Sequence, residues 1–380
     1  MRAELEGAAF VKYAGRFVWL SLDVDKPQNQ PFLHEHAIEG YPAFVIFDGT
    51  SGKVLASLMG QADVAAMEAF LQRAERAARG GAGGSVGGGP AQRGDALLGD
   101  GKADAAARAY DEALRAGGPT WSERERVIDA RLTALQLAGD NEGCARAAAT
   151  LAPGLPRRRT FAGVVLTGLT CAISSGPAKW GDELRGRLEP LAVEAQAVPG
   201  VLDDDRYQLY ERRIFARMLA HDDAAGRALA AEWLARIERD DKEGVQGADA
   251  QQARDVARVR AATRLGEPAR IVPSLEATTR TQPLSYTAWA RLAGAYLQLH
   301  RAADAEAAIL RALAAAPGPL GRASLFVQRA DARLQLDDVT AARAALDEAA
   351  RVAAAIEPPS VRAPTLQRID QKRKALPPPK

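Results

Sequence analysis

A chain of 380 residues is long enough for two or more domains with substantial hydrophobic cores. Hydrophobic residues make up 47% and charged residues 26%, which is ordinary for a globular protein and unlike a disordered one. The 50 basic and 48 acidic residues give a formal charge of +2, so the basic excess typical of nucleic-acid-binding proteins is missing. The longest apolar run, residues 161–173, is too short to cross a membrane and predicts a buried helix.

The first 79 residues alternate between helical and strand-like patterns, which predicts an α/β domain. The helices are expected at 3–14, 30–37 and 64–79. The strands are expected at 16–22, 43–47 and 53–58. A glycine-containing turn at 48–52 predicts that the last two strands form an antiparallel pair, and Asp63 is placed to cap the last helix.

Residues 80–90 consist mainly of glycine and predict a flexible linker, because such a segment sustains neither helix nor strand. From residue 91 onward, Ala, Leu and Arg recur at helical spacing, interrupted by Gly, Pro and Asp-Asp. Helices joined by short turns indicate stacked antiparallel pairs, so we expect a helical repeat array over 91–360. Residues 361–380 are basic and Pro-rich, and we expect a tail there.

One window of this array, Tyr286 to Pro317, resembles a tetratricopeptide repeat (TPR). The signature positions are occupied by Trp289, Leu292, Ala293, Tyr296, Ala305, Ile309, Ala312 and Pro317. Small residues at such positions let two helices approach closely, and the large ones fill the spaces between repeats. Weaker copies of the pattern occur at Phe326, Ala330, Ala342, Leu346 and Ala349, and at Gly94, Leu97, Ala106, Tyr110 and Ala113. A generic helical bundle is the alternative.

The resemblance implies that the array binds a protein or peptide partner on one face. Side chains that could contribute are Arg291, Tyr296, Arg301, Arg311 and Arg329. For each arginine alone, a solvated helix face is the alternative.

The N-terminal segment is similar to thioredoxin-like proteins, from their first helix onward. The similarity rests on residues 17–25, 38–48 and 52–54, followed by Gly60 and the final helix. It implies that Pro42 is the family's cis-proline and that Tyr41 and Pro42 lie in a loop that binds an extended substrate. A proline at the first position of a strand, with no special role, is the alternative.

The family's first strand and its Cys-x-x-Cys motif have no counterpart in the sequence. Thiol–disulfide exchange needs an activated thiolate and a second thiol, so we expect no catalytic residue in the chain as printed. We also expect Met1 to be an internal methionine of a longer protein, whose upstream part would carry the missing strand and the cysteines. A cytoplasmic protein is expected as printed, and a periplasmic one if that upstream part includes a signal peptide.

Other residues predict little chemistry. Cys144 and Cys171 are read as buried free thiols, with a disulfide as the alternative. His34 and His36 would point to different faces of a short helix, so we expect no metal site. The acidic runs at 203–205 and 222–223 predict helix caps, and Arg157-Arg158-Arg159 predicts a solvated loop.

Three functions remain open from the sequence. The first is an adaptor in which a redox-inactive thioredoxin-like domain is tethered to a protein-binding TPR-type array. The second is a thiol–disulfide oxidoreductase whose catalytic segment lies upstream, and the third is a truncated product without a function. We expect no cofactor, no nucleic acid and no membrane among its partners.

Overall fold

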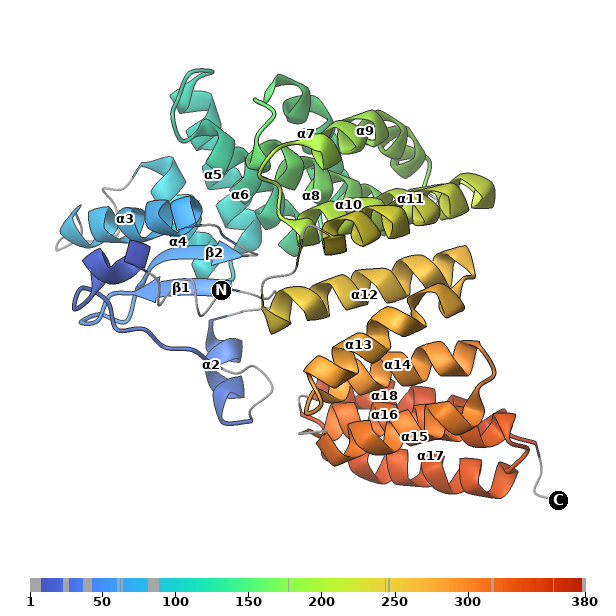
Figure 1. Ribbon diagram of the computed structural model, residues 1–380. Helices are drawn as coiled ribbons and strands as arrows, with labels where there is room; N and C mark the ends of the chain where they lie inside the picture. The colour runs from blue at the N-terminus through green and yellow to red at the C-terminus, as the bar shows by residue number, and fades with distance from the viewer. Residues whose placement is uncertain are drawn as a thin grey trace. The chain divides into compact units, whose positions relative to one another are not determined.

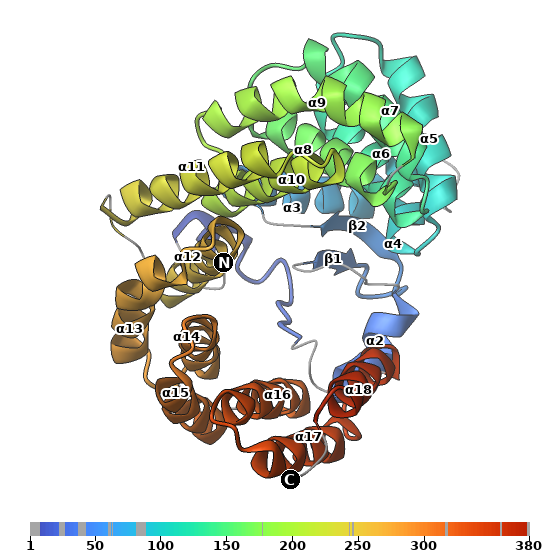
Figure 2. The same ribbon diagram turned by 90° about the vertical axis from the view of Figure 1, so that its right-hand side faces the viewer.

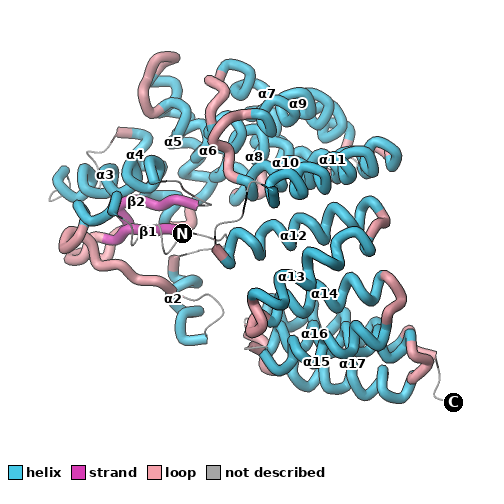
Figure 3. Tube along the Cα trace, viewed as in Figure 1, coloured by secondary structure: helices cyan, strands magenta, loops and turns pink. Residues whose placement is uncertain are grey.

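The computed structural model describes residues 8–22, 27–36, 43–59, 62, 64–80, 89–176, 178–242, 244, 247–315, 318–357 and 359–377. Most of these residues are helical, and the described part contains one sheet, of two strands (Figure 3). The chain divides into two compact units, Met1–Arg212 and Arg213–Lys380. In the described part of the chain, no helix combines the length and the apolar character needed to cross a bilayer.

The sheet is the predicted hairpin. Strand β1 (Ala43–Phe47) pairs antiparallel with β2 (Val54–Met59), so that Ala43 faces Met59. The turn is held by the Asp48 carboxylate, which accepts hydrogen bonds from the backbone N–H groups of Thr50 and Ser51 at 3.1 and 2.7 Å. Gly52 has φ +69°, a conformation that glycine adopts without strain.

The helix predicted at 64–79 is present as α3 (Val64–Gly80). It packs against β2, and Figure 1 shows the two side by side. Its buried residues join those of β2 and of the 3₁₀ helix η1 (Ala8–Tyr13) in a small core: Phe10, Tyr13, Ala56, Ala62, Met67, Phe70, Leu71 and Ala74. The predicted helix 3–14 is therefore a 3₁₀ helix over its described part. Asp63, the predicted cap of α3, lies outside the described residues.

The prediction of a strand at 16–22 is wrong, because these residues are described and form no strand. Their composition favours a strand, but a strand is stable only when its backbone pairs with a neighbour and one of its faces is covered. Here Val18 and Leu20 are 89% and 80% exposed. Phe17 alone packs on the small core.

A thioredoxin-like domain is not shown by this arrangement, and it remains a prediction. The helix predicted at 30–37 is present as α2 (Gln30–Glu35), preceded by the 3₁₀ helix η2 (Pro27–Asn29). Tyr41 and Pro42, on which the predicted cis-proline loop rests, lie outside the described residues.

From residue 90 onward, the described residues form helices and no strand. Those that begin in the first unit are α4 (Pro90–Gly99), α5 (Ala103–Gly117), α6 (Arg124–Leu137), α7 (Asn141–Leu151), η3 (Ala152–Gly154), α8 (Arg159–Ser174), α9 (Lys179–Ala197) and α10 (Asp203–Leu219). Helices α4, α6 and α8 contact one another in succession, while α5, α7 and α9 are each packed beside them. This alternation of helices between two layers is typical of a helical repeat array.

The first helix of the array also touches the hairpin. Helix α4 packs on β2, where Gly99 approaches Val54 so closely that a side chain at 99 would collide with it. Residues 81–88 of the predicted linker lie outside the described residues, while Gly80 ends α3 and Pro90 begins α4. The division of the chain at residues 80–90 remains a prediction.

The second unit repeats the alternation. Its helices are α11 (Asp223–Lys242), α12 (Ala248–Leu265), η4 (Pro268–Ile271), α13 (Val272–Thr281), α14 (Tyr286–Gln298), α15 (Ala302–Ala315), α16 (Pro319–Gln335), α17 (Val339–Ala353) and α18 (Pro359–Lys374). Helices α12, α14 and α16 contact one another in succession, and α15 and α17 pack on α14 and α16 (Figure 2). The fold of the chain is therefore mostly helical and TPR-like.

Helix α18 occupies most of the segment that was expected as a tail at 361–380. It packs on α17, and Ile369 joins the buried cluster of α16 and α17, with Val361 and Leu366 partly buried beside it. These three apolar residues give an otherwise basic helix one face that can be buried. The basic, Pro-rich composition of the segment did not indicate this face.

The two cysteines form a disulfide, which corrects the prediction of free thiols. Cys144 on α7 and Cys171 on α8 are both buried, and their Cα atoms lie 6.1 Å apart. The helical spacing of the sequence could not show this, because the register of two helices against each other is set by their packing.

The disulfide should stabilise the first unit. It closes a segment with a sequence separation of 27, so its reduction should lower the free energy of unfolding by about 3–4 kcal/mol through the entropy of the unfolded chain. Urea unfolding with and without dithiothreitol measures the difference. A Cys144→Ala/Cys171→Ala variant is the control and should not respond to the reductant. An unchanged unfolding midpoint of the reduced wild type would contradict the prediction.

Candidate functional site

The TPR signature residues lie where the two helices of one pair meet. Leu292, Ala293 and Tyr296 on α14 are buried, as are Ala305, Ile309 and Ala312 on α15. Trp289 is half-buried, and its Nε1 donates a hydrogen bond to the backbone oxygen of Pro283 at 2.9 Å. Pro317 lies outside the described residues.

The next helix pair carries the same arrangement. Phe326 and Ala330 on α16 are buried against Ala342, Leu346 and Ala349 on α17. Alanines at equivalent places in both pairs allow the close approach of their helices, which supports the repeat as a unit of packing.

Two of the arginines proposed for a binding face are engaged within the chain. The Arg301 guanidinium lies over the Tyr296 ring, 4.4 Å from its centre, and its Nε pairs with Asp304 at 2.8 Å. Arg329 donates to Glu306 at 2.9 Å. Burial raises the pKa of Tyr296 to about 12.

The other two arginines differ in exposure. Arg311 is exposed on α15. Arg291 is half-buried on α14, and desolvation lowers its pKa. The structure therefore does not gather the four arginines into one open patch.

His36, one of the two histidines of the predicted short helix, contacts aromatic side chains. The His36 ring lies 4.6 Å from the ring centres of both Phe32 and Phe47. The side chain of His34 lies outside the described residues. Within the described ranges, no group of three or more His, Cys, Asp or Glu side chains is placed to hold a metal ion.

A set of charged side chains that the sequence did not single out lies along α4, α6, α8 and α10 in the first unit. We call it the inner charged row: Asp95, Arg126, Asp129, Arg159 and Asp205. At its start, the Asp95 carboxylate accepts hydrogen bonds from Tyr110 at 2.8 Å and from Arg126 at 2.9 Å. Arg126 also pairs with Glu123 at 2.8 Å, so this end of the row is fully paired.

The other end of the row contains Arg159 and two carboxylates, those of Asp129 and Asp205. Arg159 on α8 lies 3.8 Å from Asp205 on α10, and both side chains are 22% exposed. Asp129 on α6 is half-buried, and burial together with the charge of Asp205 raises its pKa to about 6. Arg159 was predicted to lie in a solvated loop, but it is the first residue of α8.

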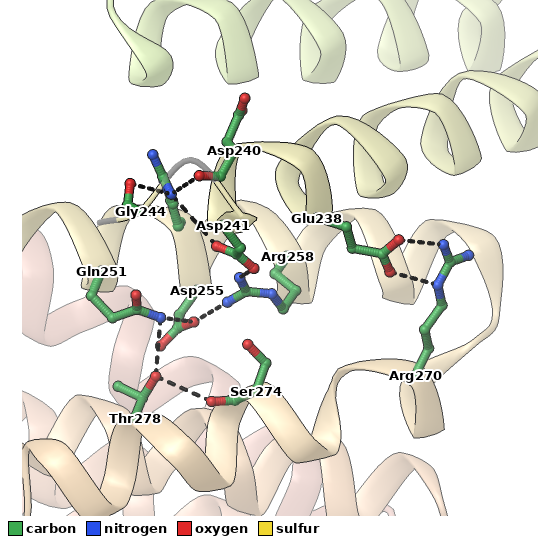
Figure 4. A network of polar contacts seen from close by, with 11 residues as sticks. Glu238, Asp240, Asp241, Gly244, Gln251, Asp255, Arg258, Arg270, Ser274 and Thr278 are labelled. Carbon is green, nitrogen blue, oxygen red and sulfur yellow. Dashed lines mark hydrogen bonds and ion pairs between the residues drawn. The ribbon is translucent and has the colours of Figure 1, made fainter. Parts of the chain in front are cut away.

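A second charged group is buried in the second unit and is shown in Figure 4. Arg258 on α12 lies between Asp241 on α11 and Asp255 on its own helix, and pairs with both. Gln251 donates to Asp255 at 3.1 Å and lies 3.2 Å from the Thr278 hydroxyl on α13. Arg258 and Asp255 are 2% and 0% exposed, so this network connects three helices inside the repeat array.

The two groups have different consequences. Burial raises the pKa of Asp255 even beside Arg258, which is the electrostatic cost of placing a carboxylate in the interior. The buried network therefore acts as a structural element, whereas the inner charged row keeps partly exposed side chains. The row is the candidate functional site.

Sequence reasoning missed both groups for one reason. Arg126 and Asp129, like Asp255 and Arg258, are opposite charges three residues apart, which is also the pattern of ordinary pairs on a helix surface. The spacing of these opposite charges is visible in the sequence, but it is the same for an ion pair on the helix surface and for a buried ion pair. The acidic runs, by contrast, lie at helix starts as predicted, because Asp203–Asp205 form the first turn of α10 and Asp222 accepts from the Ala225 N–H at 3.1 Å.

Removing the central guanidinium of the buried network should destabilise the second unit. Arg258→Met leaves Asp241 and Asp255 without their cation, and we expect a loss of about 3–5 kcal/mol in the free energy of unfolding. The matched control is Arg270→Met, which breaks the exposed pair with Glu238 (2.8 Å) shown in the same view and should cost less than about 1 kcal/mol. Chemical denaturation measures both, and equal losses would refute the structural role of Arg258.

The Asp129 carboxylate should make stability depend on pH. Because its pKa is raised to about 6 in the folded state, the protonated form is favoured by folding, and this contribution is lost as pH rises from about 4 through 6. Asp129→Asn, which cannot ionise, should therefore be more stable than the wild type at pH 7.5, by about 1–3 kcal/mol, and equally stable below about pH 4.

Thermal unfolding across this pH range measures the effect. Glu183→Gln, at an exposed position of α9, is the control and should match the wild type throughout. A pH-independent difference for Asp129→Asn would speak against the raised pKa.

No protein-family model matches the chain, and no curated protein matches it. Among solved structures, a tetratricopeptide repeat protein from Parabacteroides merdae ATCC 43184 is similar at 11% identity with a TM-score of 0.44, over 74% of this chain and 97% of that one. The TPR2AB domain of yeast Sti1, in its complex with pHSP90, is similar at 13% identity and a TM-score of 0.30, over 75% and 96%. Residues 1–338 of Acl4, the assembly chaperone of RpL4, are similar at 13% identity and 0.37, over 66% and 98%. All three TM-scores are below 0.5, so the description of the array rests on the helices of this chain.

Proposed function

We propose that this chain is a protein-binding adaptor, in which a redox-inactive thioredoxin-like segment precedes a TPR-type array that holds a protein or peptide partner. The observation that carries the proposal is the recurrence of one packing unit, α14 with α15 and α16 with α17, built on equivalent small residues such as Ala293 and Ala330. A stack of such pairs presents a long surface made of several helices, which suits an extended partner rather than a small substrate.

The chemistry of the cysteines supports the non-catalytic part of the proposal. The sequence contains two cysteines, Cys144 and Cys171, and their sulfurs are bonded to each other and buried. A buried disulfide offers no accessible thiolate for exchange with a client. In this proposal the loop with Tyr41 and Pro42 contributes to binding an extended segment and performs no catalysis.

The disulfide also favours the location of this protein in an oxidising compartment rather than in the cytoplasm, because disulfides persist where thiols are not kept reduced. The comparison of oxidised and reduced protein in urea, described above, tests whether the cross-link matters for the folded state.

The proposal predicts that the full chain binds flexible peptides through its helices. Panning a library of random twelve-residue peptides on the full chain should yield saturable binders, and hydrogen exchange with a bound peptide should show protection in helices from α4 onward. Protection confined to residues 8–80 would place recognition in the N-terminal segment, and a library without binders would refute the adaptor function.

An insulin-reduction assay distinguishes the adaptor from an oxidoreductase. The full chain should show no turnover above the rate of dithiothreitol alone. Turnover that is lost in the Cys144→Ala/Cys171→Ala variant would contradict redox inactivity.

A further inference from the structure

Residues 17–22 form an apolar segment of the first unit whose backbone is unpaired. Among the described residues, none forms a hydrogen bond with the backbone of this segment, and the ladder of the sheet joins β1 with β2 alone. Val18 and Leu20 are 89% and 80% exposed, and Trp19 and Leu22 are also exposed. Unpaired backbone groups and large apolar side chains are therefore open to a second chain within the same six residues.

The segment already shows the alternation of an extended strand. The ring centres of Phe17 and Trp19 lie 6.1 Å apart, and Phe17 also packs on the small core of the hairpin. Val18 and Leu20, which alternate with them, extend into solvent. Because successive side chains of an extended chain point to opposite sides, the spacing places Leu22 on the same side as Val18 and Leu20.

Antiparallel pairing of this segment with its own copy matches apolar residues on that side. With Leu20 on the two-fold axis, Leu20 faces Leu20, and Val18 of each copy faces Leu22 of the other. A two-fold contact of this kind uses the same surface on both chains. Cross-strand pairs of apolar side chains are the contacts that stabilise a sheet.

The charges at the two ends of the segment favour the antiparallel orientation. Arg16 precedes the segment, and its side chain remains exposed although it pairs with Glu75. Asp23 follows the segment in the sequence and itself lies outside the described residues. An antiparallel pair brings the basic end of one copy to the acidic end of the other, whereas a parallel pair would bring like charges together.

We propose that residues 17–22 are a self-association surface, through which two copies of this chain form an antiparallel β-ribbon with Leu20 at its centre. A strand of this length extends over about 20 Å, so the contact buries less than the roughly 800 Å² per partner of a standard stable interface. The dimer is therefore weak and depends on concentration. This contact does not depend on the adaptor function.

Sedimentation velocity of the full chain between about 1 and about 200 µM measures the association. We expect a monomer–dimer equilibrium for the wild type, and Leu20→Asp should weaken it roughly tenfold or more, because the two carboxylates would face each other on the axis. The matched control is Leu284→Asp, since Leu284 is an 87% exposed leucine just before α14, and this variant should associate as the wild type does. Thermal unfolding of both variants should match the wild type, because both side chains are exposed.

Opposite charges at the axis test the pairing of Leu20 with Leu20. Leu20→Lys should be monomeric alone, and an equimolar mixture of Leu20→Lys and Leu20→Asp should associate again. A mixture that stays monomeric would overturn this register. A wild type that is monomeric over the whole concentration range would overturn the self-association, as would a Leu20→Asp variant that associates as tightly as Leu284→Asp.

Discussion

The array depends on the close approach of two helices within each pair. Buried alanines line both helices of a pair, as Ala293 does on α14 and Ala305 and Ala312 do on α15. Such small side chains let the backbones come near enough for the large side chains around them to fill the remaining space. An isolated helix of the length found in this array is only marginally stable in water. Each helix pair is therefore stabilised by packing against the next pair. The same requirement accounts for α18, whose Ile369 covers the last pair.

The second unit also shows that apolar packing is not the only way to join such helices. Between α11 and α12, Arg258 pairs with both Asp241 and Asp255, and Gln251 links α12 to Thr278 on α13. Arg258 and Asp255 are buried. Buried charges cost desolvation free energy that hydrophobic residues do not, but they hold the helices in one register only.

Charge in the first unit is arranged differently. In the inner charged row, Asp95 and Arg126 form a hydrogen-bonded ion pair, whereas Asp129 lies near the like charge of Asp205 as well as near Arg159 and Arg126. Burial and the charge of Asp205 raise the pKa of Asp129 to about 6, so its ionised form carries an electrostatic cost at neutral pH. The stability of the folded chain therefore depends on pH through this side chain.

The sequence by itself determined the local elements. Two strand-like apolar runs joined by a turn that contains glycine sufficed for the hairpin of β1 and β2, and the helical spacing of Met67, Phe70 and Leu71 sufficed for α3. The TPR-like pair at α14 and α15 could be read from its own residues, because its contacts lie close together in the chain. Where a feature depends on residues within one or two turns, composition and spacing specify it.

The tertiary structure alone decided the rest. Residues 16–22 have the composition of a strand, but strand formation needs a neighbour that no local pattern supplies. The disulfide of Cys144 with Cys171 depends on how α7 lies against α8, and the difference between the exposed Arg270 pair and the buried Arg258 network depends on which faces the neighbouring helices cover. Burial is a property of the assembled helices. The spacing of a charged residue in the sequence therefore does not reveal whether its side chain contacts water or an opposite charge in the fold.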